Sequence, residues 1–108
     1  MNKVLNTLGL CACARKISDG ETLLKEIKSK KVYYVVVASD ASDNSKKRII
    51  DKCKFYKCGC VVILDKESIT KAIGRIDVVS AVGIKDYNLV KKLKENIERD
   101  DGKNEEEQ

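Results

Sequence analysis

The side chains that could do chemistry in this chain are five cysteines and a set of carboxylates, since the sequence contains no histidine. Four of the cysteines form two Cys-x-Cys pairs, Cys11/Cys13 and Cys58/Cys60. Zinc sites generally use the wider Cys-x-x-Cys spacing, and on a helix Cys11 and Cys13 would point about 200° apart. Gly59 suggests that Cys58 and Cys60 straddle a turn. We therefore interpret the cysteines as small buried apolar side chains, and we expect no metal and no cofactor.

Few residues support an enzymatic reaction. Asp40 follows an apolar run, at a position where α/β enzymes keep catalytic acids. Asp65 stands in the same way after CVVIL. Neither has a second carboxylate or a metal ligand nearby, and the missing histidine removes the commonest general base. We interpret Asp40 as a turn-forming residue and Asp65 as a helix cap, and we do not expect an enzyme. A small enzyme that uses Asp40 is the weakest alternative.

The charge balance favours a polyanionic partner. The chain has a net charge of +5, but residues 1–98 hold 20 Lys/Arg against 12 Asp/Glu, a net of +8. Residues 99–108 have a net charge of −3 and no apolar side chain. We therefore expect a single domain over residues 1–98 and an acidic, disordered tail over residues 99–108. A basic domain of this size favours nucleic acid or another polyanion as the partner.

Basic residues gather on two expected helices that flank the apolar strand. They are Lys25, Lys28, Lys30 and Lys31 on the first, and Lys46, Lys47 and Arg48 in the first turns of the second. Positive charge at a helix N-terminus opposes the helix dipole, unless an anion binds the free N–H groups there. The alternative is an ordinary solvated charged face.

Aromatic side chains are few. Tyr33 and Tyr34 begin an apolar strand, and Phe55 and Tyr56 end a helix. We expect none of them to be an exposed stacking platform, which disfavours single-strand binding by base stacking. Recognition of RNA by its shape would not need them.

The elements that must position these residues alternate between helix and strand. Apolar periodicity predicts helices over residues 3–14, 20–30, 43–57, 65–73 and 86–97, strands over residues 32–38, 60–64 and 78–82, and a short link or edge strand at Ile17–Asp19. This order predicts an α/β protein, a three-layer α/β/α sandwich with a small mixed central sheet. Ser42 and Asp86 are the expected N-caps of the helices over residues 43–57 and 86–97. The sequence shows neither a membrane span nor a signal peptide, and we expect a cytoplasmic protein.

Three segments of the chain resemble the ribosomal L-seven-A-type family of kink-turn-binding proteins. They are LGLCACARKISDGETLLKEIKSKK, ASDASDNSKKRIIDKC and the late KDYNLVKKL. The similarity covers about residues 5–95 and is closest to the small bacterial L-seven-A-like proteins. It implies an α/β/α sandwich that binds structured RNA, either kink-turn-like or ribosomal, with no DNA and no membrane as partner. Association with the ribosome is part of the same expectation.

The family signature at the start of its second helix is Gly-x-Asn-Glu, with a lysine three residues after the Glu. Anchored on Lys25, the Asn and Glu positions fall on Glu21 and Thr22, and Gly20 is displaced by one position. A carboxylate at Glu21 can accept hydrogen bonds from guanine amino groups but cannot donate as Asn does. A relaxed or different RNA target is therefore an open alternative to family-standard recognition.

Other family positions match more closely. Asp40 aligns with an acidic residue after the strand, and residues 69–74 align with the family's glycine-containing helix. The loop of residues 75–77 aligns with one that packs against flipped-out nucleotides. The resemblance implies an RNA-binding surface of Gly20, Glu21, Thr22, Lys25, Asp40, Lys71, Arg75 and Ile76, to which the basic residues of the two helices add Lys28 and Lys46.

Three alternatives stay open at this point. Gly20 is equally well explained as a plain helix start, and Ile76 as a core residue at a strand entrance. The third alternative concerns the whole protein, since the same fold could be a protein-interaction module with no direct RNA contact.

Overall fold

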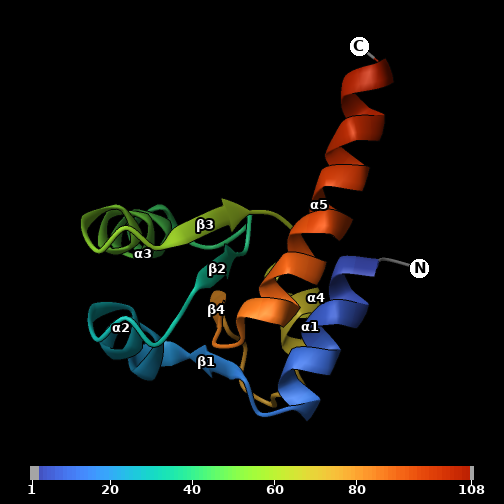
Figure 1. Ribbon diagram of the computed structural model, residues 1–108. Helices are drawn as coiled ribbons and strands as arrows, with labels where there is room; N and C mark the ends of the chain where they lie inside the picture. Colours follow the sequence, from blue (N-terminus) through green and yellow to red (C-terminus); the bar gives the residue numbers. More distant parts are fainter. Residues whose placement is uncertain (1–2, 108) are drawn as a thin grey trace.

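The computed structural model describes the backbone of residues 3–107 and the side chains of residues 3–98 (Figure 1). Helices and strands alternate along the chain, as the periodicity predicts. The helices are α1 (Lys3–Cys13), α2 (Gly20–Lys28), α3 (Asp43–Phe55), α4 (Lys66–Ala72) and α5 (Tyr87–Glu107). The strands are β1 (Ile17–Asp19), β2 (Tyr34–Val37), β3 (Gly59–Val62) and β4 (Ala81–Ile84).

The strands form one mixed sheet in the order β1-β4-β2-β3. β2 and β3 are parallel, with Tyr34 opposite Gly59, whereas β4 is antiparallel to both of its neighbours. The three-layer α/β/α sandwich with a small mixed sheet is therefore confirmed. Ile17–Asp19 is an edge strand rather than a link.

Alternating side chains of β2 enter two different cores, one on each face of the sheet. Val35 and Val37 pack in the core beneath α2 and α3, with Leu23, Ile27 and Ile49 among its other members. Val36 packs on the other face, in the core that α1, α4 and α5 cover. Figure 1 shows the sheet between these two helical layers. A strand has side chains on alternate faces, so a continuous valine run is what burial on both faces requires.

The first and last parts of the chain are neighbours in the fold. α1 packs beside α5, and Asn96 Nδ2 donates a hydrogen bond of 2.7 Å to Thr7 Oγ1. β1 likewise pairs with β4, with Ser18 opposite Gly83. Both contacts join residues that are more than 60 positions apart in the sequence.

Short polar side chains begin the later helices. The N–H of Ser45 donates to Ser42 Oγ at the start of α3, and the N–H of Ser68 donates to Asp65 Oδ2 at the start of α4. Both caps were predicted, and each satisfies an N–H group that the helix leaves open. Asp86 also caps α5 as expected, accepting from the N–H of Leu89 at 3.0 Å.

α5 is longer than the sequence predicts. It continues through Glu107 rather than ending near Ile97. The side chains of residues 99–108 lie outside the described part of the chain, so the expected disorder of this tail stays a prediction. Among the described residues, no helix has the length and apolar content needed to cross a membrane.

The expected strand over residues 78–82 is wrong at its start. The chain from Ile76 to Ser80 is a loop, in which Val78 is 65% exposed. The N–H of Val79 donates to Thr70 Oγ1, so the loop is tied to α4 instead of to the sheet. Pairing begins only at Ala81, opposite Val37, and it extends through Ile84.

The cysteines do not lie as expected at every position. Cys11 and Cys53 are buried, and burial raises the pKa of Cys11 to about 11. Cys13, in contrast, is exposed. Gly59 is not in a turn: it begins β3, and the Tyr34 ring fills the space that its side chain would occupy.

Gly83 has no side chain, and this absence allows α2 to pack close to the sheet. A Cβ at this position would lie 2.5 Å from Leu23 Cδ1 and 2.8 Å from Val32 Cγ1. We expect Gly83→Ala to lower the free energy of unfolding by about 1–3 kcal/mol, because a fully packed site must be forced apart. Urea denaturation measures this. In a Val32→Ala background the same change should be milder, and an equal effect in both backgrounds would contradict the steric explanation.

An ion pair ties α2 to the end of β4. Lys85 Nζ lies 3.0 Å from Glu26 Oε2. The pKa of Glu26 is lowered from its ordinary value of 4.5, mainly by the Ser18 hydroxyl and to a smaller extent by Lys85. A lowered pKa in the folded state stabilises the protein above the ordinary carboxyl pKa, and this stabilisation disappears as the pH falls through the lowered value. We expect Glu26→Gln to be less stable than wild type at pH 7. The difference should close at acidic pH, as thermal denaturation across the pH range would show.

Candidate functional site

The start of α2, the loop of residues 74–80 and the start of α3 come together at one end of the sheet. Arg75 Nε lies 2.7 Å from Asp19 Oδ2, which fixes the loop beside the first residues of α2. The N–H of Ala38, at the end of β2, donates to the carbonyl of Ser80 and holds the other end of the loop. Segments that are distant in sequence therefore present one surface.

A cleft of about 250 Å³ lies within this surface. It is closer in scale to a single nucleobase than to a drug-sized ligand. Leu24 and Ile49 provide apolar walls and Arg48 provides a cation. The lining residues are Gly20, Glu21, Leu24, Ser45, Arg48, Ile49 and Ser80.

The N-terminus of α2 lacks a side-chain cap. Asp19 occupies the N-cap position but accepts no hydrogen bond from the helix, because its carboxylate binds Arg75. Gly20 has a φ of +61°, and no atom lies within 4 Å of the place where its Cβ would stand. The first turn of α2 thus offers backbone N–H groups on an unobstructed surface, with exposed Glu21 and Thr22 beside them.

Ile76 is 97% exposed, so its interpretation as a core residue is wrong. Val78, two residues later in the same loop, is 65% exposed. Together these side chains form an apolar strip that follows Arg75. Such a strip contacts water at a free-energy cost that a binding partner would relieve.

Two of the expected site residues already hold parts of the protein together. Asp40 Oδ1 accepts the N–H of Lys66 at 2.8 Å, which supports the start of α4. Lys46 Nζ donates to the carbonyl of Ser39 at 2.9 Å and ties α3 to the loop after β2. Both residues lie at the same end of the sheet as the cleft, and each one holds the backbone near it in position.

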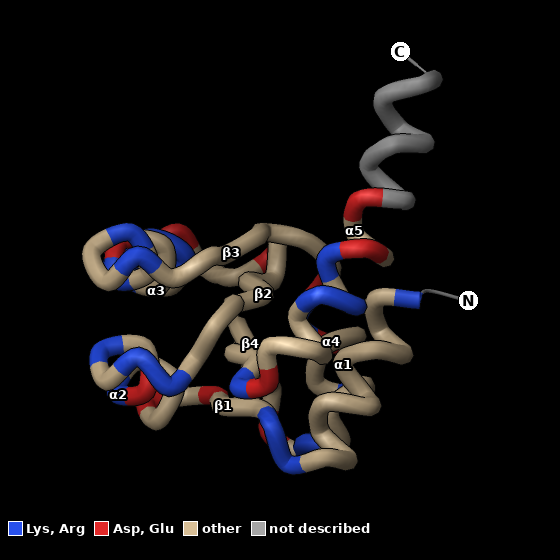
Figure 2. The backbone as a smooth tube through the Cα atoms, in the orientation of Figure 1, with Lys and Arg blue, Asp and Glu red and all other residues tan. Residues whose placement is uncertain are grey.

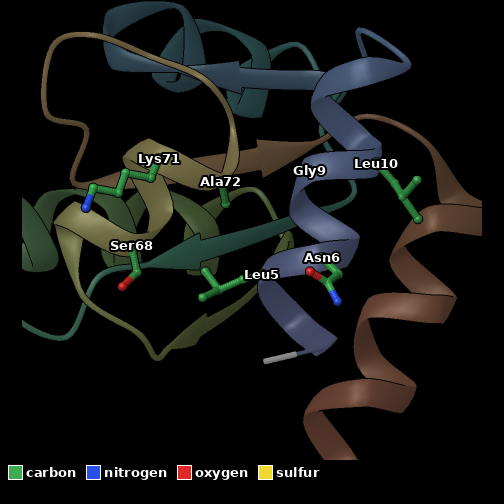
Figure 3. Close-up of a pocket in the computed structure, with 7 residues that line it drawn as sticks. All are labelled: Leu5, Asn6, Gly9, Leu10, Ser68, Lys71 and Ala72. Atoms are coloured by element: carbon green, nitrogen blue, oxygen red, sulfur yellow. The ribbon is translucent and has the colours of Figure 1, made fainter. Parts of the chain in front are cut away.

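Two other expected residues lie apart from the cleft. Lys28 is two turns along α2, about 12 Å from Gly20 along the helix axis. Lys71 belongs to α4 and forms an ion pair of 3.3 Å with Glu67. In Figure 3 its ammonium group points away from α1. Lys25 is exposed on α2, between Gly20 and Lys28.

A larger groove lies between α1 and α4 (Figure 3). Its volume is about 570 Å³, and Lys71 provides its one charged side chain. The other lining residues are Leu5, Asn6, Gly9, Leu10, Ser68 and Ala72. We take the smaller cleft as the candidate site, because charged and polar groups of α2, of α3 and of the loop before β4 converge there.

Sequence reasoning missed Asp19, Ser45, Arg48 and Ser80 as site residues. Arg48 was recognised only as one member of a basic run, although it lies more than one and a half turns along α3 from the Ser42 cap and lines the cleft. The contact of Asp19 with Arg75 spans 56 positions in the sequence. No local pattern contains that information.

The site end of the sheet mixes both signs of charge. Figure 2 shows acidic segments at the end of β1 and the start of α2, close to basic ones. The carboxylates at this end are Asp19, Glu21, Asp40, Asp43, Asp65 and Asp77. Attraction of a polyanion cannot by itself select this surface, so groups that form specific contacts must contribute.

The expectation that Tyr33 and Phe55 are not exposed stacking platforms is wrong, because both rings are exposed, as is that of Tyr87. Tyr33 is 52% exposed, Phe55 76% and Tyr87 62%. None of these three lines the cleft at the start of α2. Among the described residues no group of three His, Cys, Asp or Glu side chains could hold a metal ion.

No family model matches the chain. It is 39% identical over 97 residues to the RNA-binding protein YlxQ of Enterococcus faecium, a match that covers 89% of this chain and 92% of the relative. It is 33% identical over 87 residues to the RNA-binding protein YlxQ of Bacillus subtilis (strain 168), covering 80% of this chain and 86% of that protein.

Two solved structures share the fold. A protein of unknown function from Bacillus halodurans C superimposes with a TM-score of 0.84 at 32% identity, covering 91% of this chain and 99% of that one. The Giardia lamblia 15.5kD RNA binding protein gives a TM-score of 0.70 at 20% identity, covering 88% of this chain and 82% of that one. The second match concerns the fold alone.

The bond from the N–H of Lys66 to Asp40 leads to a prediction about stability. We expect Asp40→Ala to destabilise the protein by about 1 kcal/mol, because an N–H of α4 loses its acceptor. Asp40→Asn, which keeps a side-chain oxygen, should be milder. Chemical denaturation of the three proteins measures this, and equal stability of Asp40→Ala and wild type would contradict the role.

Proposed function

Since the chain belongs to the YlxQ family of L-seven-A-like RNA-binding proteins, we propose that it binds structured RNA through the start of α2 and the loop of residues 74–80. The proposed target is a sharply bent, kink-turn-like element, either in ribosomal RNA or in another folded RNA. The protein acts in this proposal as a binding module without catalysis.

One observation carries the proposal. The unobstructed first turn of α2 lines the cleft, and the 97% exposed Ile76 directly follows Arg75, whose ion pair with Asp19 holds this loop beside that turn. The combination of free N–H groups, a cation and an apolar side chain suits a bent RNA, which presents phosphates and splayed bases side by side.

Each group has a role that follows from its geometry. Asp19 uses the Nε of Arg75, so the two terminal nitrogens of that guanidinium stay available for phosphate. Lys25 provides a second phosphate contact, one and a half turns along α2. Ile76 and Val78 would pack against an unstacked base, and Arg48 would contact a base or phosphate that enters the cleft.

Specificity would depend on Glu21 and Thr22. A Glu21 carboxylate accepts hydrogen bonds from guanine amino groups, while the Thr22 hydroxyl supplies a donor that a carboxylate lacks. Tandem G·A pairs, which expose guanine amino groups at a bend, therefore remain a chemically reasonable target. The pair need not reproduce the contacts of an Asn-Glu pair, so the preference for a kink-turn is the decisive property to measure.

The test is a binding titration against a kink-turn RNA and a matched duplex without the G·A pairs, at two salt concentrations. We expect the kink-turn to bind more tightly, and the affinity for both RNAs to fall as salt rises. Lys25→Gln should weaken kink-turn binding roughly tenfold, as expected for a lost charge-assisted contact, and should lower the salt slope by about one. Ile76→Ser should weaken binding without changing that slope.

Lys3→Gln is the matched control, since it removes an equally exposed lysine from the far end of α1. If Lys25→Gln and Lys3→Gln behave alike, the proposed surface is wrong. If wild-type protein binds neither RNA, and its co-purifying partners resist ribonuclease, the protein-interaction module is the better explanation.

A further inference from the structure

Lysines gather at the end of the sheet opposite to the cleft. Lys16 precedes β1, Lys31 lies three residues before β2, Lys57 lies two residues before β3, and Lys85 follows β4 directly. In this mixed sheet all four positions fall at the same end, because β4 runs against its neighbours. Arg15 and Lys30 adjoin them, and we name these six residues the basic end.

Hydrogen bonds connect these segments across the sheet. The N–H of Lys85 donates to the carbonyl of Lys16 at 2.8 Å, and the N–H of Tyr33 donates to the carbonyl of Ile84 at 2.9 Å. Cys58 Sγ lies 3.5 Å from the carbonyl of Val32, which joins the starts of β2 and β3. The basic end is therefore one continuous surface that crosses all four strands.

Most of the basic side chains here are not neutralised. The acidic residues at this end are Glu26 and Asp86, and Glu26 forms its ion pair with Lys85. Asp86 accepts from the N–H of Leu89 at the start of α5. In the part of the chain whose side chains are described, no salt bridge involves Lys16, Lys31 or Lys57, and all three are exposed.

The backbone at the basic end adds a second observation. Arg15, Lys30 and Lys57 have φ values of 58°, 62° and 57°, just after the ends of α1, α2 and α3. Glycine is the usual residue at such positions, since it takes this conformation without strain. The helix dipoles are already matched by Lys28 and Lys54 in the last turns of α2 and α3. Three further cations at strained positions indicate a use for the charge itself.

Exposed tyrosines lie among these lysines. Tyr33 precedes β2 and lies beside Lys85, while Tyr87 begins α5. Their ring centroids are 6.1 Å apart at an interplanar angle of 73°. Because the two rings meet edge to face and both are more than half exposed, they leave ring faces open to an incoming base.

We infer that the basic end is a second RNA-binding surface, and that it takes a single-stranded segment. Tyr33 and Tyr87 stack with bases, while Lys31, Lys57 and Lys16 hold the phosphates. Stacking on tyrosine requires bases that are free of pairing, which favours a single strand over a duplex. The identification of the partner as RNA rests on the proposed function, whereas the presence of exposed rings among lysines is independent of it. The protein would then hold a folded element at one end and an unpaired strand at the other.

The experiment is a fluorescence-anisotropy titration of the full chain with labelled oligouridylate of about 12 nucleotides. We expect salt-sensitive binding that Tyr33→Ser or Tyr87→Ser weakens by roughly fivefold or more, whereas Tyr33→Phe keeps the wild-type affinity because its ring still stacks. Lys57→Gln should weaken binding more than the control Lys3→Gln. All these side chains are exposed, and a thermal-denaturation curve for each variant confirms that it is folded.

Three results would overturn the inference: no binding of oligouridylate, equal affinities of Lys57→Gln and Lys3→Gln, or an equal loss in Tyr33→Phe and Tyr33→Ser. A saturating amount of kink-turn RNA without single-stranded ends should leave the oligouridylate bound, and its complete displacement would also count against a separate surface. Lys25→Gln should not affect the oligouridylate. A loss of kink-turn binding alone would therefore refute the proposed function and leave this surface intact.

Discussion

The burial of β2 on both faces is the constraint on which the rest of this structure depends. Val36 belongs to one core and its neighbours Val35 and Val37 to the other, so three consecutive residues fix two helical layers at once. No side chain of this strand faces solvent along that run, which leaves only the strand ends for polar groups. Apart from Lys25 and Arg48, which lie within α2 and α3, the residues with a proposed role accordingly lie on loops or helix termini at one end of the sheet or the other, positioned by the core.

Much of this arrangement could be predicted from the sequence. The valine run, the apolar spacing of the helices and the polar caps at Ser42, Asp65 and Asp86 are local signals, and each led to the correct element. The start of β4 could not be read in this way, because VVSAV is mostly apolar while pairing begins only where Ala81 meets Val37. The Asp19 to Arg75 contact and the position of Arg48 in the cleft depend on tertiary packing, for which the sequence has no local sign. The exposure of Tyr33 was missed because the residue lies inside an apolar run, between the buried Val32 and the partly buried Tyr34.

Net charge alone does not indicate one binding surface on this protein. The surface that the family resemblance indicates carries many carboxylates, whereas several lysines without a salt bridge lie at the opposite end of the sheet. Net charge is a property of the whole molecule, but a binding partner interacts with the charges on one local surface. For this protein the two ends of one small sheet present different chemistries: specific polar and apolar groups at one, and lysines with tyrosine rings at the other.

The adjacency of the chain's first and last parts has a consequence for its synthesis. β1 pairs with β4, and α1 packs against α4 and α5, so the first 20 residues lack most of their native neighbours until the later elements of the domain have been synthesised. The parallel unit of α2, β2, α3 and β3 can assemble earlier, with the face that includes Val36 still uncovered. Asp19 likewise meets Arg75 only at a late stage. A nascent chain therefore cannot present the complete surface at the start of α2 until the loop of residues 74–80 has been synthesised.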